Sequence, residues 1–263
     1  MRLYIPPFSL LSFLFLILMT VPWIGYSQVA FEASADGIPV QYFQDQPMNP
    51  WAGGINSGQF SNIDLDLDGV QDVLVFDREG DRILPFVQEG TPGFSQLVYH
   101  PELREAFPPL KTFVLARDFD QDGKMDLFSY QDNGIIVYKN SSTLGTGLQF
   151  SPFQLTPLMS NVPGNGLQVI EIPSTDIPVL EDLDGDGDLD IVTFNLLGTL
   201  LDYHKNLSVE TFGNPNSLAF ILEEACWGHV MEDDANNSLT LGVTCKTGST
   251  TGGNLHAGSS ILT

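Results

Sequence analysis

An acidic nine-residue pattern occurs three times in this chain, and it constrains the fold more than any other feature of the sequence. The copies are residues 64–72, 118–126 and 182–190, so that successive copies start 54 and 64 residues apart. Each copy has Asp at positions 1, 3, 5 and 9 and Gly at position 6. A repeat of this period is typical of propeller blades and solenoids, in which each unit packs against its neighbours.

The segments on both sides of each acidic loop are typical of β-strands. They are short runs of apolar, β-branched and aromatic residues, bounded by the Gly, Asn and Asp that mark strand ends and turns. The expected strands are 60–63, 113–116 and 177–180 before the loops, 73–76, 127–130 and 191–194 directly after them, and 82–87, 135–140 and 199–206 as third strands. Each unit is therefore predicted to be strand, acidic loop, strand, tight turn and strand, which makes the fold all-β. The one short helical turn is expected around residues 102–107.

The spacing of the carboxylates is that of a calcium-binding loop. Side chains at positions 1, 3, 5 and 9 converge when the chain curls around a cation, and the glycine at position 6 permits the sharp turn. The carbonyl of position 7 adds another oxygen. Calcium takes six to eight oxygen ligands, magnesium prefers a tighter octahedron, and transition metals favour His or Cys, which the loops lack. We therefore expect Ca²⁺ as the cofactor, at about three sites.

The expected ligands fall into two groups, carboxylates at positions 1, 3, 5 and 9 and backbone carbonyls at position 7. The carboxylate ligands are Asp64, Asp66, Asp68, Asp72, Asp118, Asp120, Asp122, Asp126, Asp182, Asp184, Asp186 and Asp190. The carbonyl ligands are Val70, Lys124 and Asp188. Without a cation, the four carboxylates of one loop repel each other, so that metal binding becomes part of the free energy of folding.

Two other interpretations of the acidic loops compete with a calcium site. A solvated acidic turn is the plainer one, because Asp and Gly are common turn residues; three copies between matching strands favour the metal site instead. An EF-hand needs a Glu at loop position 12 and flanking helices. Position 12 here holds Val75, Ser129 and Thr193, and the flanks are predicted strands, which excludes the EF-hand.

These residues resemble the FG-GAP or VCBS repeat, the calcium-binding blade unit of integrin-α-type β-propellers, and the resemblance covers residues 49–206. It implies a partial β-propeller of FG-GAP/VCBS blades with calcium-binding DxDxDG loops. Such propellers usually close with about seven blades of four strands. Residues 207–263 have no acidic loop and are expected to start a further, truncated unit, with the remaining blades outside this chain.

Three other segments resemble large exported repeat proteins of Bacteroidetes-type bacteria. They are the lead-in at 49–54 and the later segments 226–228 and 256–259. In those proteins a C-terminal sorting domain directs the chain to the cell surface, and we identify no such domain in this sequence. The predicted domains are thus a signal peptide, 1–27, and an incomplete propeller, 28–263.

The signal peptide is predicted from the first residues. Arg2 provides a short basic start, Phe8 to Met19 form an apolar run, and the small residues Gly25 and Ser27 are spaced as for cleavage. A run of about a dozen residues is short for a membrane span, so an uncleaved anchor is the weaker alternative. We expect the protein to be secreted or displayed at the cell surface, with no membrane span after signal removal.

Charge and cysteines narrow the function classes further. The chain carries 10 Lys and Arg against 33 Asp and Glu, a net charge of −23. This balance argues against nucleic acid as a partner, because phosphate binding needs clustered basic residues. The two cysteines, Cys226 and Cys245, can form a disulfide in an oxidising compartment; two unpaired buried thiols are the alternative.

The favoured function is a non-enzymatic, calcium-binding module that serves as a scaffold for adhesion or for binding an unknown extracellular protein or glycan. The alternative is the propeller part of a secreted carbohydrate-active enzyme such as a polysaccharide lyase, and a third possibility is a receptor-like ligand-binding face. Candidate carboxylate pairs for the enzyme are Glu223 with Glu224 and the run 232–234. The four histidines are His100, His204, His229 and His256, and none lies in a recognised catalytic motif.

Overall fold

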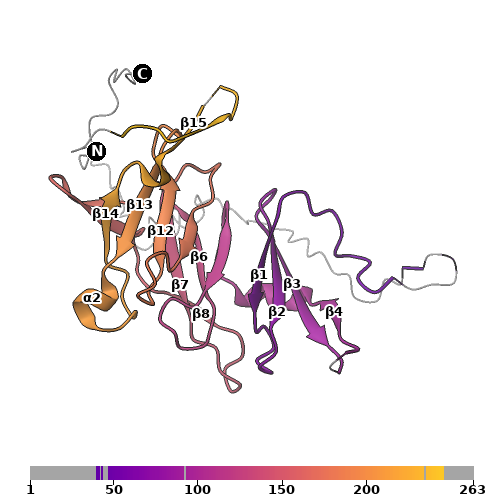
Figure 1. Ribbon diagram of the computed structural model, residues 1–263. Helices are drawn as coiled ribbons and strands as arrows, with labels where there is room; N and C mark the ends of the chain where they lie inside the picture. The colour runs from indigo at the N-terminus through magenta and orange to yellow at the C-terminus, as the bar shows by residue number, and fades with distance from the viewer. Residues whose placement is uncertain (1–39, 42, 44–46, 92, 234, 246–263) are drawn as a thin grey trace, which may run out of the picture. The chain divides into compact units, whose positions relative to one another are not determined.

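The computed structural model describes residues 40, 41, 43, 47–91, 93–233 and 235–245 (Figure 1). All of its strands lie in residues 42–263, which form one compact part of the chain. The expected signal peptide, 1–27, and the segment 256–259 lie outside the described residues. Among the residues that the structure describes, no helix is long and apolar enough to cross a membrane.

The first sheet contains the first acidic loop. Its strands are β1 (Gly58–Ile63), β2 (Asp72–Asp77), β3 (Arg82–Glu89) and β4 (Gln96–Tyr99), paired antiparallel in that order. The loop joins β1 to β2, as the sequence predicts. The fourth strand, β4, is the addition, and a 3₁₀ helix, η1 (Pro101–Ala106), follows it where a helical turn was expected.

The second sheet repeats this plan around the second acidic loop. Its strands are β5 (Val114–Arg117), β6 (Asp126–Gln131), β7 (Gly134–Asn140) and β8 (Phe150–Pro152), again in sequence order. A two-residue turn joins β6 to β7, with positive φ at both Asp132 (49°) and Asn133 (61°). This backbone matches the twist of the two strands, and Asn and Asp tolerate it better than most residues.

The third sheet has six strands in the order β10-β9-β14-β13-β12-β11. Strands β11 (Val179–Glu181), β12 (Asp190–Phe194), β13 (Leu201–Asn206) and β14 (Phe220–Glu224) form an antiparallel unit around the third acidic loop. A hairpin of β9 (Met159–Val162) and β10 (Gly166–Val169) extends it, because β9 pairs parallel with β14. This hairpin precedes β11 in the chain, which explains the longer spacing between the second and third acidic loops.

The boundary expected at residue 207 differs from the structure. Residues 207–224 form a short helix, α2 (Ser208–Phe212), and β14, which pairs with β13 and so completes the third sheet instead of starting a further unit. The Asn206 side chain holds the connection from β13 to β14 in place, since its oxygen accepts hydrogen bonds from the Ser208 and Ala219 backbone N–H groups. The fourth strand carries no acidic loop, so the repeat pattern could not reveal it.

Two apolar cores join the three sheets. The first contains residues of the first two units, with Ile63, Leu65 and Phe76 packed together with Val114 and Leu127. The second contains residues of the second and third units, among them Phe119, Phe128, Leu180, Ile191 and Phe220. Each unit thus buries its apolar side chains against the next one, as expected for repeats that cannot form a core alone.

The last described strands form a separate hairpin closed by a disulfide. Strands β15 (Val230–Glu232) and β16 (Leu239–Leu241) pair antiparallel after a short 3₁₀ helix, η2 (Trp227–His229). Cys226 and Cys245 are disulfide-bonded across this segment, which confirms the pairing expected from the sequence.

Reduction of the Cys226–Cys245 disulfide is expected to lower the free energy of unfolding by about 3 kcal/mol, the cost of closing a loop of this length in the unfolded chain. Chemical denaturation with and without reductant measures the difference. A variant with Ser at both positions should have the same free energy of unfolding as the reduced protein, with or without reductant. Equal stability of oxidised and reduced protein would mean that the hairpin unfolds independently of the sheets.

A buried histidine connects the β9–β10 hairpin to the rest of the third sheet. The Nδ1 atom of His204 on β13 lies 2.9 Å from the Ser160 hydroxyl on β9, and both residues are buried. Burial lowers the pKa of His204 to about 4. The folded state therefore favours the neutral ring, whereas the unfolded chain takes up a proton near pH 6.5.

Acidification should lower the free energy of unfolding, because protonation of His204 favours the unfolded chain. The contribution of His204 is fully present above pH 6.5 and falls as the pH drops from 6.5 toward 4, by up to about 3 kcal/mol. Unfolding free energies measured at pH 7.5 and pH 4.5 for wild type and H204Q test this, because carboxylate contributions common to both proteins cancel in the difference. An identical pH dependence of the two proteins would contradict it.

Candidate metal centres

The aspartate at position 9 anchors each acidic loop to its sheet. Asp72, Asp126 and Asp190 are almost completely buried at the start of the second strand of each unit. One carboxylate oxygen accepts a hydrogen bond from the N–H of loop position 2, at 2.7, 3.4 and 3.1 Å respectively. The other oxygen accepts one from the third strand, at 2.7, 2.7 and 2.8 Å.

The aspartate at position 1 closes each loop on itself. In all three loops its Oδ2 accepts a hydrogen bond from the N–H of the glycine at position 6. These distances are 3.0 Å for Asp64, 2.9 Å for Asp118 and 3.1 Å for Asp182. The glycines adopt φ values of 86°, 86° and 99°, which favour a residue without a side chain. The three loops therefore have the same fold.

This curl brings carboxylate oxygens together in each loop. Oxygens lying within 4.8 Å of one another come from three residues per loop: Asp64, Asp66 and Asp72; Asp118, Asp120 and Asp122; and Asp182, Asp184 and Asp190. A further group joins Asp184 and Asp186 to Glu210 of α2. Of the twelve expected carboxylate ligands, Asp68 and Asp126 lie outside these groups. Each group can hold a metal ion.

Unpaired buried oxygens indicate that the loops fit a cation. Four such oxygens are buried without a hydrogen-bond partner, one in each of the first two loops and two in the third: Asp64 Oδ1, Asp120 Oδ1, Asp186 Oδ2 and Asp188 Oδ1. A buried carboxylate oxygen without a donor is costly, and a bound cation would satisfy it. The donors are all carboxylate oxygens, the ligand type of hard cations such as Ca²⁺ and Mg²⁺. The expected carbonyl ligands Val70, Lys124 and Asp188 occupy position 7 of the same loops.

Burial and mutual repulsion raise the pKa values of several loop carboxyls. Burial raises the pKa of Asp126 to about 7 and, less strongly, those of Asp66, Asp186 and Asp190. Neighbouring carboxylates add to the effect in each case. The loops are therefore electrostatically strained as carboxylates at neutral pH, and a bound cation would relieve that strain.

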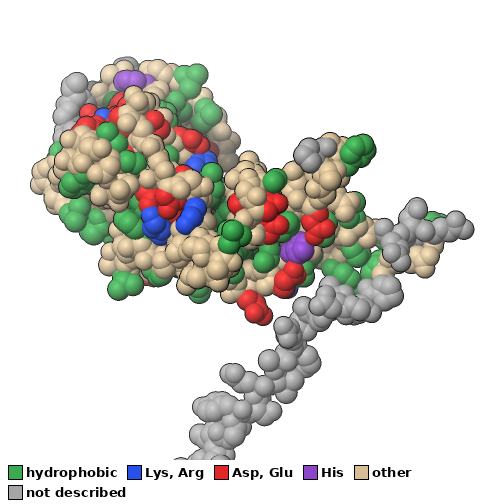
Figure 2. All heavy atoms as spheres, turned by 90° about the horizontal axis from the view of Figure 1, so that it is seen from below, with side chains coloured by type: hydrophobic (Ala, Val, Ile, Leu, Met, Phe, Trp, Pro, Cys, Tyr) green, Lys and Arg blue, Asp and Glu red, His purple; other side chains and the backbone are tan. Residues whose placement is uncertain are grey.

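Lysine ammonium groups lie against two of the three clusters. Lys139 contacts Asp120 Oδ2 and lies 3.5 Å from Asp122 Oδ2. Lys205 contacts Asp184 Oδ2 and lies 2.6 Å from Glu210 Oε1. Figure 2 shows acidic side chains gathered on one face, with basic side chains directly beside one acidic group. The hydrogen bond to Lys205 lowers the pKa of Asp184.

The second and third loops also contact each other. Gln121, at position 4 of the second loop, donates a hydrogen bond from its side chain to the Gly187 carbonyl of the third (2.7 Å). Arg117, directly before the second loop, donates to the Leu180 carbonyl (3.0 Å) and to Glu181 (2.8 Å), directly before the third. These bonds join the two loops across the boundary between the second and third sheets.

A family model for the FG-GAP-like repeat matches residues 118–193. This segment is therefore similar to an FG-GAP-like repeat. It begins at Asp118, the first residue of the second acidic loop, and ends inside β12 after the third loop. The first unit has the same loop and the same order of strands as the second unit, whose acidic loop begins the matched segment. No curated protein and no solved structure gave a significant match to the chain.

Two loop contacts around the FG-GAP-like segment could not be expected from the acidic pattern. The side chain of Asp188 is buried, and its Oδ2 accepts a hydrogen bond from the Val209 N–H of α2 (2.9 Å). Burial raises the pKa of Asp188 to about 6. Glu210 comes to the same loop from α2, which lies beyond the predicted strands. A recurring Lys-Asn pair at 139–140 and 205–206 was the only sequence signal for the lysines.

The residues considered for catalysis do not gather at one place among the described residues. His100 lies between Glu89 and Glu102, at 2.9 and 2.6 Å, and His229 Nδ1 lies 2.9 Å from the Val243 carbonyl. His204 is bonded to Ser160 in the core. Glu223 and Glu224 lie on β14 and Glu232 ends β15, whereas Asp234 and His256 are outside the described residues.

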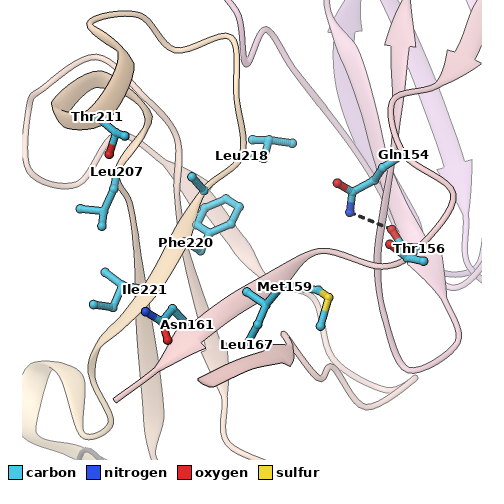
Figure 3. Close-up of a pocket in the computed structure, with 11 residues that line it drawn as sticks. Gln154, Thr156, Met159, Asn161, Leu167, Leu207, Thr211, Leu218, Phe220 and Ile221 are labelled. Carbon is cyan, nitrogen blue, oxygen red and sulfur yellow. Dashed lines mark hydrogen bonds between the residues drawn. The ribbon is translucent and has the colours of Figure 1, made fainter. Parts of the chain in front are cut away.

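An apolar pocket of about 390 Å³ lies between the added hairpin, β14 and the start of α2 (Figure 3). Its apolar lining includes Met159, Leu167, Leu207, Phe220 and Ile221. Its polar lining consists of amide and hydroxyl side chains, such as Gln154, which donates to the Thr156 carbonyl (2.7 Å). None of the lining residues carries a titratable side chain.

Proposed function

We propose that this protein is a calcium-binding β-propeller-type module that acts outside the cytoplasm as a non-enzymatic scaffold for an extracellular protein or glycan. The observation that carries the proposal is the threefold cluster of carboxylates, together with at least one buried carboxylate oxygen in each loop that lacks a hydrogen-bond partner. Three equivalent loops between equivalent strands are a pattern of structural sites, in which the cation holds the fold together.

Calcium is preferred over magnesium because of the number and kind of oxygen donors. Each loop brings three carboxylates together, and the sequence assigns a fourth carboxylate and a carbonyl to it; this set exceeds what magnesium usually takes from protein, since that ion retains several waters in a tight octahedron. Calcium accepts six to eight oxygens in flexible geometry. The expected ligands are those assigned from the sequence, and Glu210 is an additional candidate at the third loop.

The extracellular location has two supports. Disulfides form and persist in oxidising compartments, and Cys226–Cys245 is such a bond. FG-GAP repeats also typically occur in extracellular proteins. The signal peptide predicted at residues 1–27 would supply the export route.

Isothermal titration of the metal-free protein with calcium tests the metal part of this proposal. Three ions should bind per chain, and magnesium should bind more weakly. A variant with Ala at Asp66, Asp120 and Asp184 should lose calcium binding, whereas E105A, which removes one exposed carboxylate, should keep it. Absence of calcium binding by a folded wild-type sample would overturn the proposal.

A glycan array and a panel of extracellular-matrix proteins test the scaffold part. Binding should require calcium and disappear with a chelator, without any change in the ligand. Release of unsaturated or shortened polysaccharide products by the purified protein would instead establish an enzyme. Loss of those products in variants of the carboxylate pair Glu223 and Glu224 would then assign the catalytic residues.

A further inference from the structure

The three acidic loops differ at one equivalent position of the third strand. The N–H groups of Gln88, Asn140 and Asn206 donate to the position 9 aspartate of their own loop, which makes these three residues equivalent. The residue before each of them therefore also occupies an equivalent place. It is Val87 in the first unit, Lys139 in the second and Lys205 in the third.

Both lysines insert their ammonium groups among carboxylates assigned to calcium. Lys139 contacts Asp120 Oδ2, lies 3.5 Å from Asp122 and stands 5.8 Å from the centre of the Phe119 ring. Lys205 contacts Asp184 Oδ2 and lies 3.7 Å from Asp186. A divalent cation bound to these oxygens would be in direct repulsion with the ammonium, because like charges a few ångströms apart interact strongly near a protein surface.

The first loop has no such counter-charge. Val87 is buried and packs in the core that joins the first two units. Within the described part of the chain, no ion pair involves a carboxylate of the first loop. Asp64, Asp66, Asp68 and Asp72 therefore have no ammonium or guanidinium group within ion-pair distance among the described residues.

We propose that Lys139 and Lys205 are built-in counter-cations that compete with calcium at the second and third loops, so that the first loop is the tightest calcium site. This inference rests on the proposed calcium-binding function. Without calcium, each lysine holds the carboxylates together, and it must leave its contact with Asp120 or Asp184 when calcium enters. The competition weakens the second and third sites and leaves the first unaffected.

Calcium titration calorimetry of wild type, K139M, K205M and the double variant tests the competition. Wild type should bind one ion tightly and two ions more weakly. Each single variant should strengthen one of the two weak sites about tenfold or more, and the double variant should show three sites of similar affinity. K139R and K205R keep the charge and should retain the weak sites.

K111M is the matched control, since it also removes one positive charge in the second unit. The Lys111 backbone N–H bonds to Ser129 in the middle of β6, away from the acidic loop. K111M should leave all three affinities close to those of wild type. An equal gain in calcium affinity for K111M and K139M would show that the effect comes from net charge alone, and it would overturn the proposed competition.

Thermal melts provide a second measurement that distinguishes competition from a merely structural role. In chelator, K139M and K205M should melt below wild type, because the loops lose the ammonium group that contacts their carboxylates. In saturating calcium, both variants should melt at or above wild type. Equal affinities at all three wild-type sites, unchanged in the lysine variants, would overturn this inference; absence of calcium binding by every protein would overturn the proposed function instead.

Discussion

Removal of calcium is expected to lower the midpoint of thermal unfolding of this protein by about 15 °C or more. A ligand at a hundred times its dissociation constant stabilises the folded state by about 2.7 kcal/mol per site, so three sites contribute about 8 kcal/mol. For a folded unit of about 200 residues, each kcal/mol shifts the midpoint by roughly 2–4 °C. Melting curves of the full chain in calcium, in magnesium and in chelator measure the shift.

Substitutions in the loops sharpen this expectation. Ala at Asp66, Asp120 and Asp184 should abolish the calcium-dependent part of the shift; in chelator the variant should melt no lower than K139M and K205M, which lose the same lysine contacts. E105A should melt like wild type in both conditions. A midpoint that is equal in calcium and in chelator would show that the carboxylate clusters are solvated acidic turns, the plainer interpretation of the sequence pattern.

The second large effect is expected in the core between the second and third units. Phe128 on β6 is completely buried, and its ring meets that of Phe119 edge-on at a centroid distance of 6.3 Å. F128A should lower the free energy of unfolding by about 3–5 kcal/mol, from lost burial and from the cavity left behind. Phe119 is position 2 of the second loop, so the cavity also lies beneath a metal site.

Urea denaturation in saturating calcium measures the effect of F128A, with an unchanged slope as the sign of an intact folded state. F94A is the control, because Phe94 has 87% of its surface exposed and its replacement should change stability by about 0.5 kcal/mol or less. Similar losses of unfolding free energy in F128A and F94A would contradict the packing of the second sheet against the third in this core.

The acidic pattern predicted the parts of the fold that lie close to it in sequence. Asp at position 9 and the apolar runs beside it located the strands on both sides of each loop, because loop and strands form one local unit. The repeat of the same unit indicated an all-β fold of sheets packed on one another. A helical turn was expected around residues 102–107 and is found at 101–106. The Cys226–Cys245 bond was expected because the protein was predicted to be exported to an oxidising compartment.

The parts that were not predicted depend on distant partners. Strand β8 has three residues and ends at Pro152, too short for a recognisable pattern. Strand β9 pairs parallel with β14, about sixty residues further along the chain, and nothing in either segment alone indicates that pairing. For the same reason, sequence reasoning placed the start of a new unit at residue 207, where the structure has the return of the third sheet.

The sequence predicted most of the carboxylates of the candidate metal centres but not the lysines that contact them. The spacing brought nine of the twelve expected carboxylates into three clusters, and Asp186 into a fourth with Glu210. The lysines were missed because they reach the loops from the third strand, about twenty residues after each loop begins. Only the topology places the end of that strand beside the loop.

A crystal structure of the calcium-soaked protein, with anomalous diffraction collected at long wavelength, tests the central claim most directly. We expect three anomalous peaks, one in each of the loops 64–72, 118–126 and 182–190, each surrounded by oxygen ligands at calcium distances of about 2.3–2.6 Å. The strongest peak at limiting calcium should lie in the first loop. Well-ordered loops without any anomalous peak at saturating calcium would contradict the account.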